Sequence, residues 1–242
     1  MDALIYTAMS GAERALHAQQ VHANNLANLD TPGFRANMEL ATSQAVKGGY
    51  GYDARHLGAL QANAISGREG AVRQTGRDLD VALAGPGYLT VQWQDGEAYT
   101  RSGSMAIDAD GALTVSGHPV LGEGGPIVLP PYTALSIGAD GTISVQIDGQ
   151  TQMQVIDKLK LVRADAADLT KNEAGLIVSR TGDELPADDT VGVRGGFLEG
   201  SNVSAVEEMV ATMSLTRDFE VQMKLYKAAD GMAEAGNRLI RE

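Results

Sequence analysis

The sequence has no cysteine, which excludes both a disulfide framework and thiolate chemistry. It also lacks a dense run of basic residues, and its formal net charge is -12, with 19 Lys and Arg against 31 Asp and Glu. Nucleic acids and anionic membranes both attract basic surfaces, so we expect neither as a partner. No apolar stretch reaches the length of a membrane span, which argues against direct membrane insertion.

Signals for secretion and for catalysis are missing as well. The first twenty residues, MDALIYTAMSGAERALHAQQ, carry no basic segment followed by a continuous apolar run, so we expect no cleaved signal peptide. His17 and His22 lie about 140° apart on a helix, which is unsuitable for joint metal ligation. The calcium-like start at Asp108 has Pro119 where a bidentate Glu belongs. The sequence therefore predicts no catalytic residue, no metal site and no cofactor.

A long amphipathic helix is predicted at the N-terminus, from about residue 4 to 29. Its apolar positions alternate in steps of four and three, the spacing of a coiled-coil seam. The seam contains Ile5, Met9, Ala12, Leu16, Gln19, Ala23 and Leu26, of which Gln19 alone is polar. Pro32 and Gly33 end the helix, because they favour the central positions of a type II turn in the sequence Thr-Pro-Gly-Phe.

A second long helix is predicted at the C-terminus, over at least residues 201–230, where no Gly or Pro interrupts the chain. Ser204 and Glu207 have the spacing of a capping box. The apolar stripe contains Val206, Val210, Met213, Leu215, Phe219, Met223, Tyr226, Ala229 and Ala233. One step of only two residues, from Met213 to Leu215, breaks its register.

The region between the helices is expected to be all β. Residues 36–76, with KGGYGYD at 47–53, are polar and rich in Gly and Ala, which favours an extended linker. From residue 77 to 195, short runs of β-forming residues alternate with turns, including Asp-Gly pairs at 110 and 140. The predicted fold class is α+β, an all-β central domain with the terminal helices (1–35 and 196–242) pairing as a coiled coil.

Three asparagines, Asn24, Asn25 and Asn28, stand in the last turn of the first helix. Asparagine is a mediocre helix former because its side chain competes for backbone hydrogen bonds. A fraying C-terminal turn explains them. A partner outside the helix that bonds to these amides explains them equally well.

Four segments resemble bacterial flagellar rod and hook proteins: ANNLANLDTPGFRA at 23–36, GRDLDVALAGPGYLTVQ at 76–92, GEAYTRSGSMAIDADGALTVSGHPVLGEGGPI at 96–127 and LEGSNVSAVEEMV at 198–210. The resemblance implies a structural subunit of the periplasmic rod in the flagellar basal body. It implies terminal helices that line a tube, self-assembly, contacts with neighbouring proximal and distal rod proteins, and export by the flagellar type III apparatus. The LDTPGFRA form and the compact length favour a proximal rod member over a distal one and argue against the longer hook proteins.

The resemblance places the subunit interface on the two helices and the motif that follows the first. The expected interface residues are Ile5, Met9, Leu16, Asn24, Asn25, Leu26, Asn28, Thr31, Pro32, Gly33, Phe34, Asn202, Val206, Val210, Met213, Phe219, Met223 and Tyr226. Two other functions stay open at this point. One is a secreted β-rich binding module with a helical stalk, whose Trp93, Tyr88 and Tyr99 would face a sugar. The other is a hydrolase that uses a pair of carboxylates.

Overall fold

The computed structural model describes residues 2–45, 56–94 and 96–241. It has an N-terminal helix, a β-rich central region and a C-terminal helix, which confirms the α+β class. The chain forms two compact units. The helical unit contains Met1–Ala27, Asn37–Asn63 and Ser204–Glu242, and the β-rich unit contains Asn28–Ala36 and Ala64–Val203. The chain therefore passes between the units four times, after residues 27, 36, 63 and 203.

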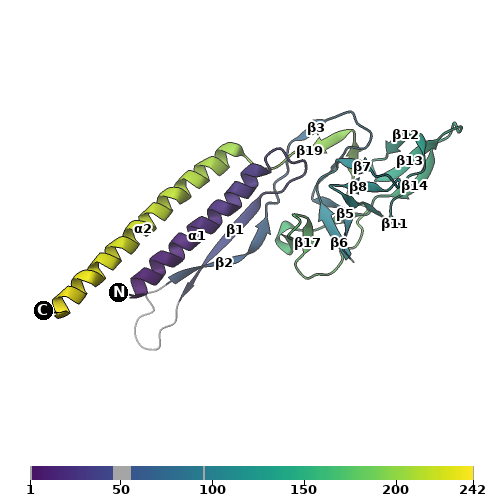
Figure 1. The fold of residues 1–242 in the computed structure, drawn as a ribbon. Coiled ribbons are helices and arrows are strands. Elements are labelled where there is room, and N and C mark those ends of the chain that lie inside the picture. The colour runs from purple at the N-terminus through teal and green to yellow at the C-terminus, as the bar shows by residue number, and fades with distance from the viewer. Residues whose placement is uncertain (1, 46–55, 95, 242) are drawn as a thin grey trace. The chain divides into compact units, whose positions relative to one another are not determined.

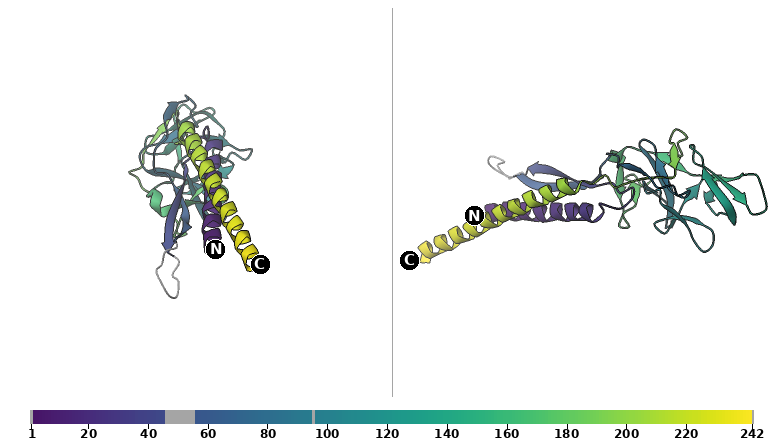
Figure 2. Two further views of the ribbon diagram at one scale, coloured as in Figure 1. Left: turned by 90° about the vertical axis from the view of Figure 1, so that its left-hand side faces the viewer. Right: turned by 90° about the horizontal axis from the view of Figure 1, so that it is seen from above.

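The helical unit is built on α1 (Asp2–Ala27) and α2 (Ala205–Arg241), which lie side by side and antiparallel (Figures 1 and 2). The Gln19 Nε2 donates to Thr216 Oγ1 over 2.9 Å. A Cβ added to Gly11 would lie 2.9 Å from the Gln222 side chain, so the two helices are in close contact there. At the start of α2, Ser204 Oγ accepts from the Glu207 N–H over 3.4 Å, as the predicted cap requires.

The buried face of α1 differs from the predicted seam by about one residue. Ala8, Ala12, Ala15 and Ala18 are buried, whereas Leu16, at the predicted seam, is 46% exposed. Met9 and Leu26 are exposed as well. Small side chains let two backbones approach closely, so alanines occupy the tightest contact and the large apolar residues turn outward. Ala12 of the predicted seam lies on this buried face, whereas Met9, Leu16 and Leu26, which we expect at a subunit interface, lie outside it.

The apolar stripe of α2 divides between two faces at the step of two residues noted in the sequence. Val206, Val210 and Met213 lie on an exposed face. Beyond the step, Phe219 and Met223 are half-buried and Ala229 is fully buried. A shift of two positions moves a side chain by about 200° around a helix, so the break in register marks the change from the outward face to the face against α1.

The segment expected as an extended linker contains three strands: β1 (Asn37–Ala45), β2 (His56–Ile65) and β3 (Val72–Gln74). β1 and β2 pair in a two-stranded sheet, and β1 packs on α1. Their residues have weak strand propensity, so pairing and packing override composition here. The linker prediction therefore fails for these strands, and KGGYGYD lies outside the described residues.

The β-rich unit consists of antiparallel sheets of two to five strands. The largest has the order β15-β5-β6-β17-β16, and the others are β12-β13-β14, β7-β8-β9, β10-β11, β18-β4 and β19-β3. Their bounds are β4 (Val81–Leu83), β5 (Gly87–Trp93), β6 (Gly96–Thr100), β7 (Met105–Ile107), β8 (Leu113–Val115), β9 (His118–Pro119), β10 (Leu121–Gly122), β11 (Gly125–Pro126), β12 (Tyr132–Ile137), β13 (Thr142–Ile147), β14 (Gln154–Lys158), β15 (Leu161–Arg163), β16 (Leu169–Lys171), β17 (Ile177–Ser179), β18 (Val193–Gly195) and β19 (Phe197–Glu199), with a short 3-10 helix at Ala166–Asp168.

Turn chemistry and a shared core stabilise this unit. The Asp-Gly pairs make tight turns between β7 and β8 and between β12 and β13, where Gly111 and Gly141 have φ values of 83° and 86°. One large apolar cluster includes Val81, Leu89 and Ile143, and a smaller one surrounds Tyr88 and Tyr99. In the part of the chain that the structure describes, no helix is long and apolar enough to span a membrane.

Candidate functional site

Three segments of the β-rich unit lie next to points where the chain passes to the helical unit, and these segments are hydrogen-bonded to one another. The Ser66 N–H donates to the Ala36 carbonyl over 2.8 Å. Asn202 Oδ1 accepts from the Ala36 N–H over 2.7 Å, and Asn202 Nδ2 donates to the Arg68 carbonyl over 2.8 Å. One amide side chain therefore joins all three segments. We call this region, residues 28–36, 66–70 and 199–202 with Arg101 and Lys171, the junction cluster.

The Thr31–Phe34 segment enters this cluster as the predicted tight turn. The Phe34 N–H donates to the Thr31 carbonyl over 3.2 Å, and Gly33 has a φ of 69°, as the third residue of a type II turn requires. The Gly33 N–H donates to the Glu199 carbonyl over 2.8 Å. A Cβ at Gly33 would lie 2.2 Å from the Arg101 backbone, so glycine is needed for both conformation and space.

Beneath the turn lies a buried cluster of three charges. Glu199 forms ion pairs with Arg35, over 2.9 Å, and with Arg101, and the three side chains are 2%, 3% and 1% exposed. Glu199 Oε1 also accepts from the Gly70 N–H over 2.8 Å, and Arg101 Nη1 donates to the Gly85 carbonyl over 2.6 Å. Burial lowers the pKa of Arg35 and raises the pKa of the neighbouring Tyr88. One carboxylate thus holds two guanidinium groups that come from distant parts of the chain.

Lys171, at the end of β16, covers the turn. Its Nζ lies 3.7 Å from the centroid of the Phe34 ring and donates to the Arg35 carbonyl over 2.7 Å. Desolvation lowers the pKa of Lys171 to about 8. The aromatic ring favours the charged ammonium by a cation–π interaction, which opposes the effect of burial.

In the helical unit, Asn25 explains part of the asparagine cluster. Its side chain is almost fully buried and pairs with the backbone of Asn37 at the start of β1, donating to the carbonyl over 3.0 Å and accepting from the N–H over 2.8 Å. Its Nδ2 also lies 3.3 Å from Glu208 Oε1 on α2, and His22 Nδ1 lies 2.5 Å from Glu208 Oε2. The amide of Asn25 is thus used inside the chain, which accounts for this asparagine without a contact to a neighbouring subunit. Asn24 Oδ1 accepts from Asn37 Nδ2 over 3.1 Å at the surface.

The other expected interface residues, besides Asn24 and Asn25, fall into three groups. The β-rich unit brings together Asn28, Thr31, Pro32, Gly33, Phe34 and Asn202. On the helices, Met9, Leu16, Leu26, Val206, Val210, Met213 and Tyr226 are exposed. Ile5, Phe219 and Met223 are half-buried on the helices.

The sequence analysis missed Arg35, Arg101, Glu199 and Lys171. Arg35, Arg101 and Glu199 lie within the segments that resemble the flagellar proteins, but nothing in the sequence indicates that they meet, because they are far apart along the chain. Arg101 follows β6 directly and reads as an ordinary surface residue after a strand. One signal in the sequence could have indicated the buried cluster: the charged Arg35 directly follows the apolar turn residue Phe34.

The arrangement of this cluster suits a structural role. Among the described residues, no group of three or more His, Cys, Asp or Glu side chains is placed to hold a metal ion. The carboxylate of the cluster is saturated with internal donors, so it is not available to act as a general base. The geometry fixes how three chain segments are held together.

The comparisons with known proteins agree with this structural role. Residues 5–35 match the family described as flagella basal body rod protein, residues 82–145 the flagellar hook protein FlgE/F/G D1 domain, and residues 194–239 the flagellar basal body rod FlgEFG protein C-terminal region. The flagellar basal-body rod protein FlgF of Escherichia coli (strain K12) is 41% identical, and the alignment covers 99% of both chains. The chain belongs to the FlgF family of flagellar basal-body rod proteins.

Two further relatives define the assignment. FlgF of Salmonella typhimurium is 39% identical over 99% of both chains. FlgG of Buchnera aphidicola subsp. Schizaphis graminum, also a flagellar basal-body rod protein, is 32% identical over 94% of this chain and 97% of its own. The chain is more similar to these FlgF proteins than to this FlgG, so the alternative of a distal rod protein is not favoured. The family consists of structural rod proteins and not of enzymes, which also disfavours the hydrolase interpretation.

Proposed function

We propose that this protein assembles helically, with copies of itself and with neighbouring proximal rod proteins and the distal rod protein FlgG, to form the proximal part of the flagellar rod. The observation that carries the proposal is the apolar surface that the helical unit leaves uncovered. Met9 is 59% exposed on α1, and Val206, Val210 and Met213 are exposed on α2. Exposed apolar rows of this kind mark protein–protein contacts, and a contact that does not close on itself produces a helical assembly.

The finer geometry belongs to the same proposal. Within each subunit, α1 and α2 would pair as a coiled coil through the alanine row, and the outward rows would pack against the helices of adjacent subunits. The heptad-like spacing of both rows supports this arrangement, because positions three and four residues apart share one helix face. The assembled helices would then form the inner wall of the rod.

We further propose that the chain reaches the periplasmic rod through the flagellar type III export apparatus and that α1 stays in the assembled rod. Support comes from the packing of α1 against α2 and β1, since loss of α1 would remove part of the proposed assembly surface.

A gene deletion tests the proposal. Cells without the gene are expected to lack flagella while retaining early basal-body intermediates, and the full-length gene should restore motility. A matched variant restricted to residues 28–203 retains the β-rich unit and loses both helices. It should fail to restore motility. If the deletion strain carries normal rods, the proposed function is wrong.

The same variant separates this proposal from a secreted binding module with a helical stalk. A module that acts through its β-rich part would keep its function without α1 and α2. A rod subunit would lose all assembly.

A further inference from the structure

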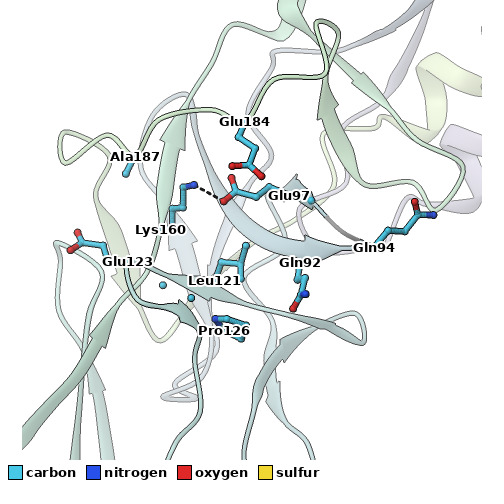
Figure 3. Close-up of a pocket in the computed structure, with 12 residues that line it drawn as sticks. Gln92, Gln94, Glu97, Leu121, Glu123, Pro126, Lys160, Glu184 and Ala187 are labelled. Atoms are coloured by element: carbon cyan, nitrogen blue, oxygen red, sulfur yellow. Dashed lines mark hydrogen bonds and ion pairs between the residues drawn. The ribbon is translucent and has the colours of Figure 1, made fainter.

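An open pocket in the β-rich unit has its least exposed charges paired within the chain. The pocket has a volume of about 720 Å³ and lies beside β5, β6 and the β10–β11 hairpin (Figure 3). Its Lys160 Nζ lies 2.5 Å from Glu97 Oε1. The helical unit differs, because Glu13 on α1 and Arg217 on α2 are exposed and form no ion pair with another described residue.

Glu13 belongs to a row of exposed residues along α1. We define the α1 outer row as Tyr6, Met9, Glu13, Leu16, Gln20 and Ala23. Its members follow one another in steps of three and four residues, so they share one face of the helix. This face is turned away from the buried face that contains Ala15. Glu13 is the one charged residue in the row.

Arg217 belongs to a corresponding row along α2. We define the α2 outer row as Val206, Val210, Met213, Arg217, Val221 and Lys224, which are all exposed. These residues also follow one another in steps of three and four, on the side of α2 that is turned away from the buried Ala229. Both outer rows thus combine exposed apolar side chains with charge, and their charges are opposite in sign.

The two rows match when they are placed antiparallel. Within the subunit α1 and α2 already run antiparallel, so α1 of one copy meets α2 of the next in that orientation wherever neighbouring copies point the same way. With Glu13 opposite Arg217, the apolar positions also coincide, because both rows advance in steps of three and four. Leu16 then faces Met213. The remaining pairs are Tyr6 with Lys224, Met9 with Val221, Gln20 with Val210 and Ala23 with Val206.

Other alignments leave a charge without its partner. In the parallel orientation, Glu13 lies opposite Met213, and Arg217 faces an apolar residue of α1. Shifting the antiparallel alignment by one heptad places Arg217 opposite Tyr6 in one direction and opposite Gln20 in the other. Removing a charge from water without a counter-charge is costly. The exposed charges therefore favour the antiparallel alignment that pairs Glu13 with Arg217.

We propose that the α1 outer row of one subunit packs antiparallel on the α2 outer row of a second copy of this chain, with Glu13 and Arg217 paired across the contact. The complementary charges lie on two rows of the same chain, which selects a second copy as the occupant. Because the two rows are different surfaces, the contact is heterologous, and each added copy leaves one row free for the next. The formation of this contact in a rod rests on the proposed function.

Disulfide crosslinking tests the register, since the chain has no cysteine of its own. Cells that lack the native gene express one chain with Leu16→Cys and a second chain, with a longer tag, that carries Met213→Cys. With one thiol on each chain, a crosslink between these positions forms only between copies. Diamide treatment of isolated basal bodies should join the two chains.

A thiol on another face of α1 is the matched control. Arg14 is exposed and adjacent to the row, so Arg14→Cys should crosslink to Met213→Cys at least about tenfold less than Leu16→Cys does, because distant thiols cannot form a disulfide. Equal yields from the two positions, or no crosslink between Leu16→Cys and Met213→Cys, would overturn the proposed register.

An exchange of charges tests the ion pair independently of thiols. Glu13→Arg alone and Arg217→Glu alone place like charges opposite each other, so each should cause a loss of motility. The chain that carries both changes restores the pair and should recover motility. Glu13→Arg combined with Arg14→Glu keeps the net charge without restoring the pair, and should stay non-motile. Both residues of the pair are exposed, so the single variants should keep the unfolding midpoint of the isolated subunit.

The outcomes separate this inference from the proposed function. Normal motility of the single variants, or no recovery in the chain with both changes, would show that Glu13 and Arg217 do not pair between copies. If the deletion strain lacks rods while these tests fail, the protein is a rod subunit whose outer rows pack on a different partner. Normal rods in the deletion strain would instead contradict the proposed function itself.

Discussion

Arg35 and Glu199 form a 2.9 Å ion pair in the interior of the β-rich unit, where both side chains are almost fully excluded from water. Glu199 also pairs with Arg101, so this single carboxylate neutralises charges from the Thr-Pro-Gly-Phe motif and from the segment after β6. Removing one partner of a buried ion pair is far more costly than replacing the whole pair by apolar residues, because it leaves an uncompensated charge in the interior. Glu199 is therefore the residue on which the integrity of the junction cluster depends most.

Replacing Glu199 by Gln should destabilise the β-rich unit strongly. The change leaves two buried guanidinium groups without a counter-charge, and breaking a buried pair in this way costs about 3–5 kcal/mol. Chemical denaturation followed by the fluorescence of Trp93, the single tryptophan, measures the effect. Glu173→Gln, at an exposed site, is the control and should change the stability by less than about 0.5 kcal/mol. Equal midpoints for the two variants would show that the buried charges contribute little.

Gly33 and Gly76 offer a matched test of the packing around the turn. Both have a φ near 70°, but a Cβ at Gly33 would overlap the Arg101 backbone, whereas a Cβ at Gly76 would meet nothing within 4 Å. Gly76→Ala should cost about 1–2 kcal/mol for the left-handed conformation alone. Gly33→Ala should cost clearly more, because the turn must also move away from Arg101. Similar unfolding midpoints for both variants would contradict the close contact.

Asn25, which is buried, should contribute more to stability than its neighbour Asn24, whose hydrogen bond to the Asn37 side chain lies at the surface. Asn25→Asp removes the donor to the Asn37 carbonyl and places a carboxylate beside Glu208, so the helical unit should lose about 1–3 kcal/mol. Asn24→Asp makes the same chemical change at an exposed position. The Asn37 N–H donates to the Asn25 side chain. Hydrogen exchange at this N–H should become faster in Asn25→Asp and stay unchanged in Asn24→Asp.

Lys171 should make the stability depend on pH above neutrality. Its pKa in the folded protein is about 8, below the ordinary value of 10.5, because of burial. Between these values the unfolded chain binds more protons at this site than the folded chain, so the contribution of Lys171 to stability should rise from about pH 8 to 10.5. The difference in unfolding free energy between the native protein and Lys171→Met isolates this contribution from the tyrosines that titrate nearby. A difference that falls or stays constant over this range would contradict it.

Phe34 provides an independent test of the same site. Its ring favours the charged form of Lys171. Phe34→Leu should therefore lower the pKa of Lys171 further, as followed by NMR of the lysine side chain. An unchanged pKa would show that the ring does not interact with the ammonium.

The sequence was sufficient for features that depend on local chemistry. The two long helices, the Ser204 cap, the turn at Gly33 and the Asp-Gly turns all follow from residue types at fixed spacing. It was insufficient where two segments must meet. The phase of α1 depends on α2 and β1, which select alanines for the closest contact, and the pairing of β1 with β2 does not depend on strand propensity. The Arg35–Glu199–Arg101 cluster could not be predicted, because burial of a charge becomes favourable only when its partners arrive from elsewhere in the chain.

Adjacent residues on α1 separate the packing within a subunit from the proposed contacts between subunits. Ala15 is 4% exposed and lies on the inner face, while Leu16 is on the outer row. Ala15→Asp buries a charge and should unfold or separate the helices of the isolated protein, at a cost of more than about 2 kcal/mol. In Leu16→Asp the charge is exposed to water. The free energy of unfolding of the isolated protein should therefore stay within about 0.5 kcal/mol of that of the unmodified protein.

In cells, Leu16→Asp should have a strong effect on rod assembly even though it has little effect on the stability of the isolated subunit. Leu16→Asp places a carboxylate where an apolar contact to the next subunit is proposed, so rods should fail to assemble and motility should be lost although the subunit is stable. Val210→Asp, on the outer face of α2, should behave like Leu16→Asp. Phe219 is a poorer probe, because it is half-buried within the chain and its replacement would affect both processes. Normal motility with Leu16→Asp and Val210→Asp would mean that the outer rows do not contact other subunits, and the helical assembly would have to be built through another surface.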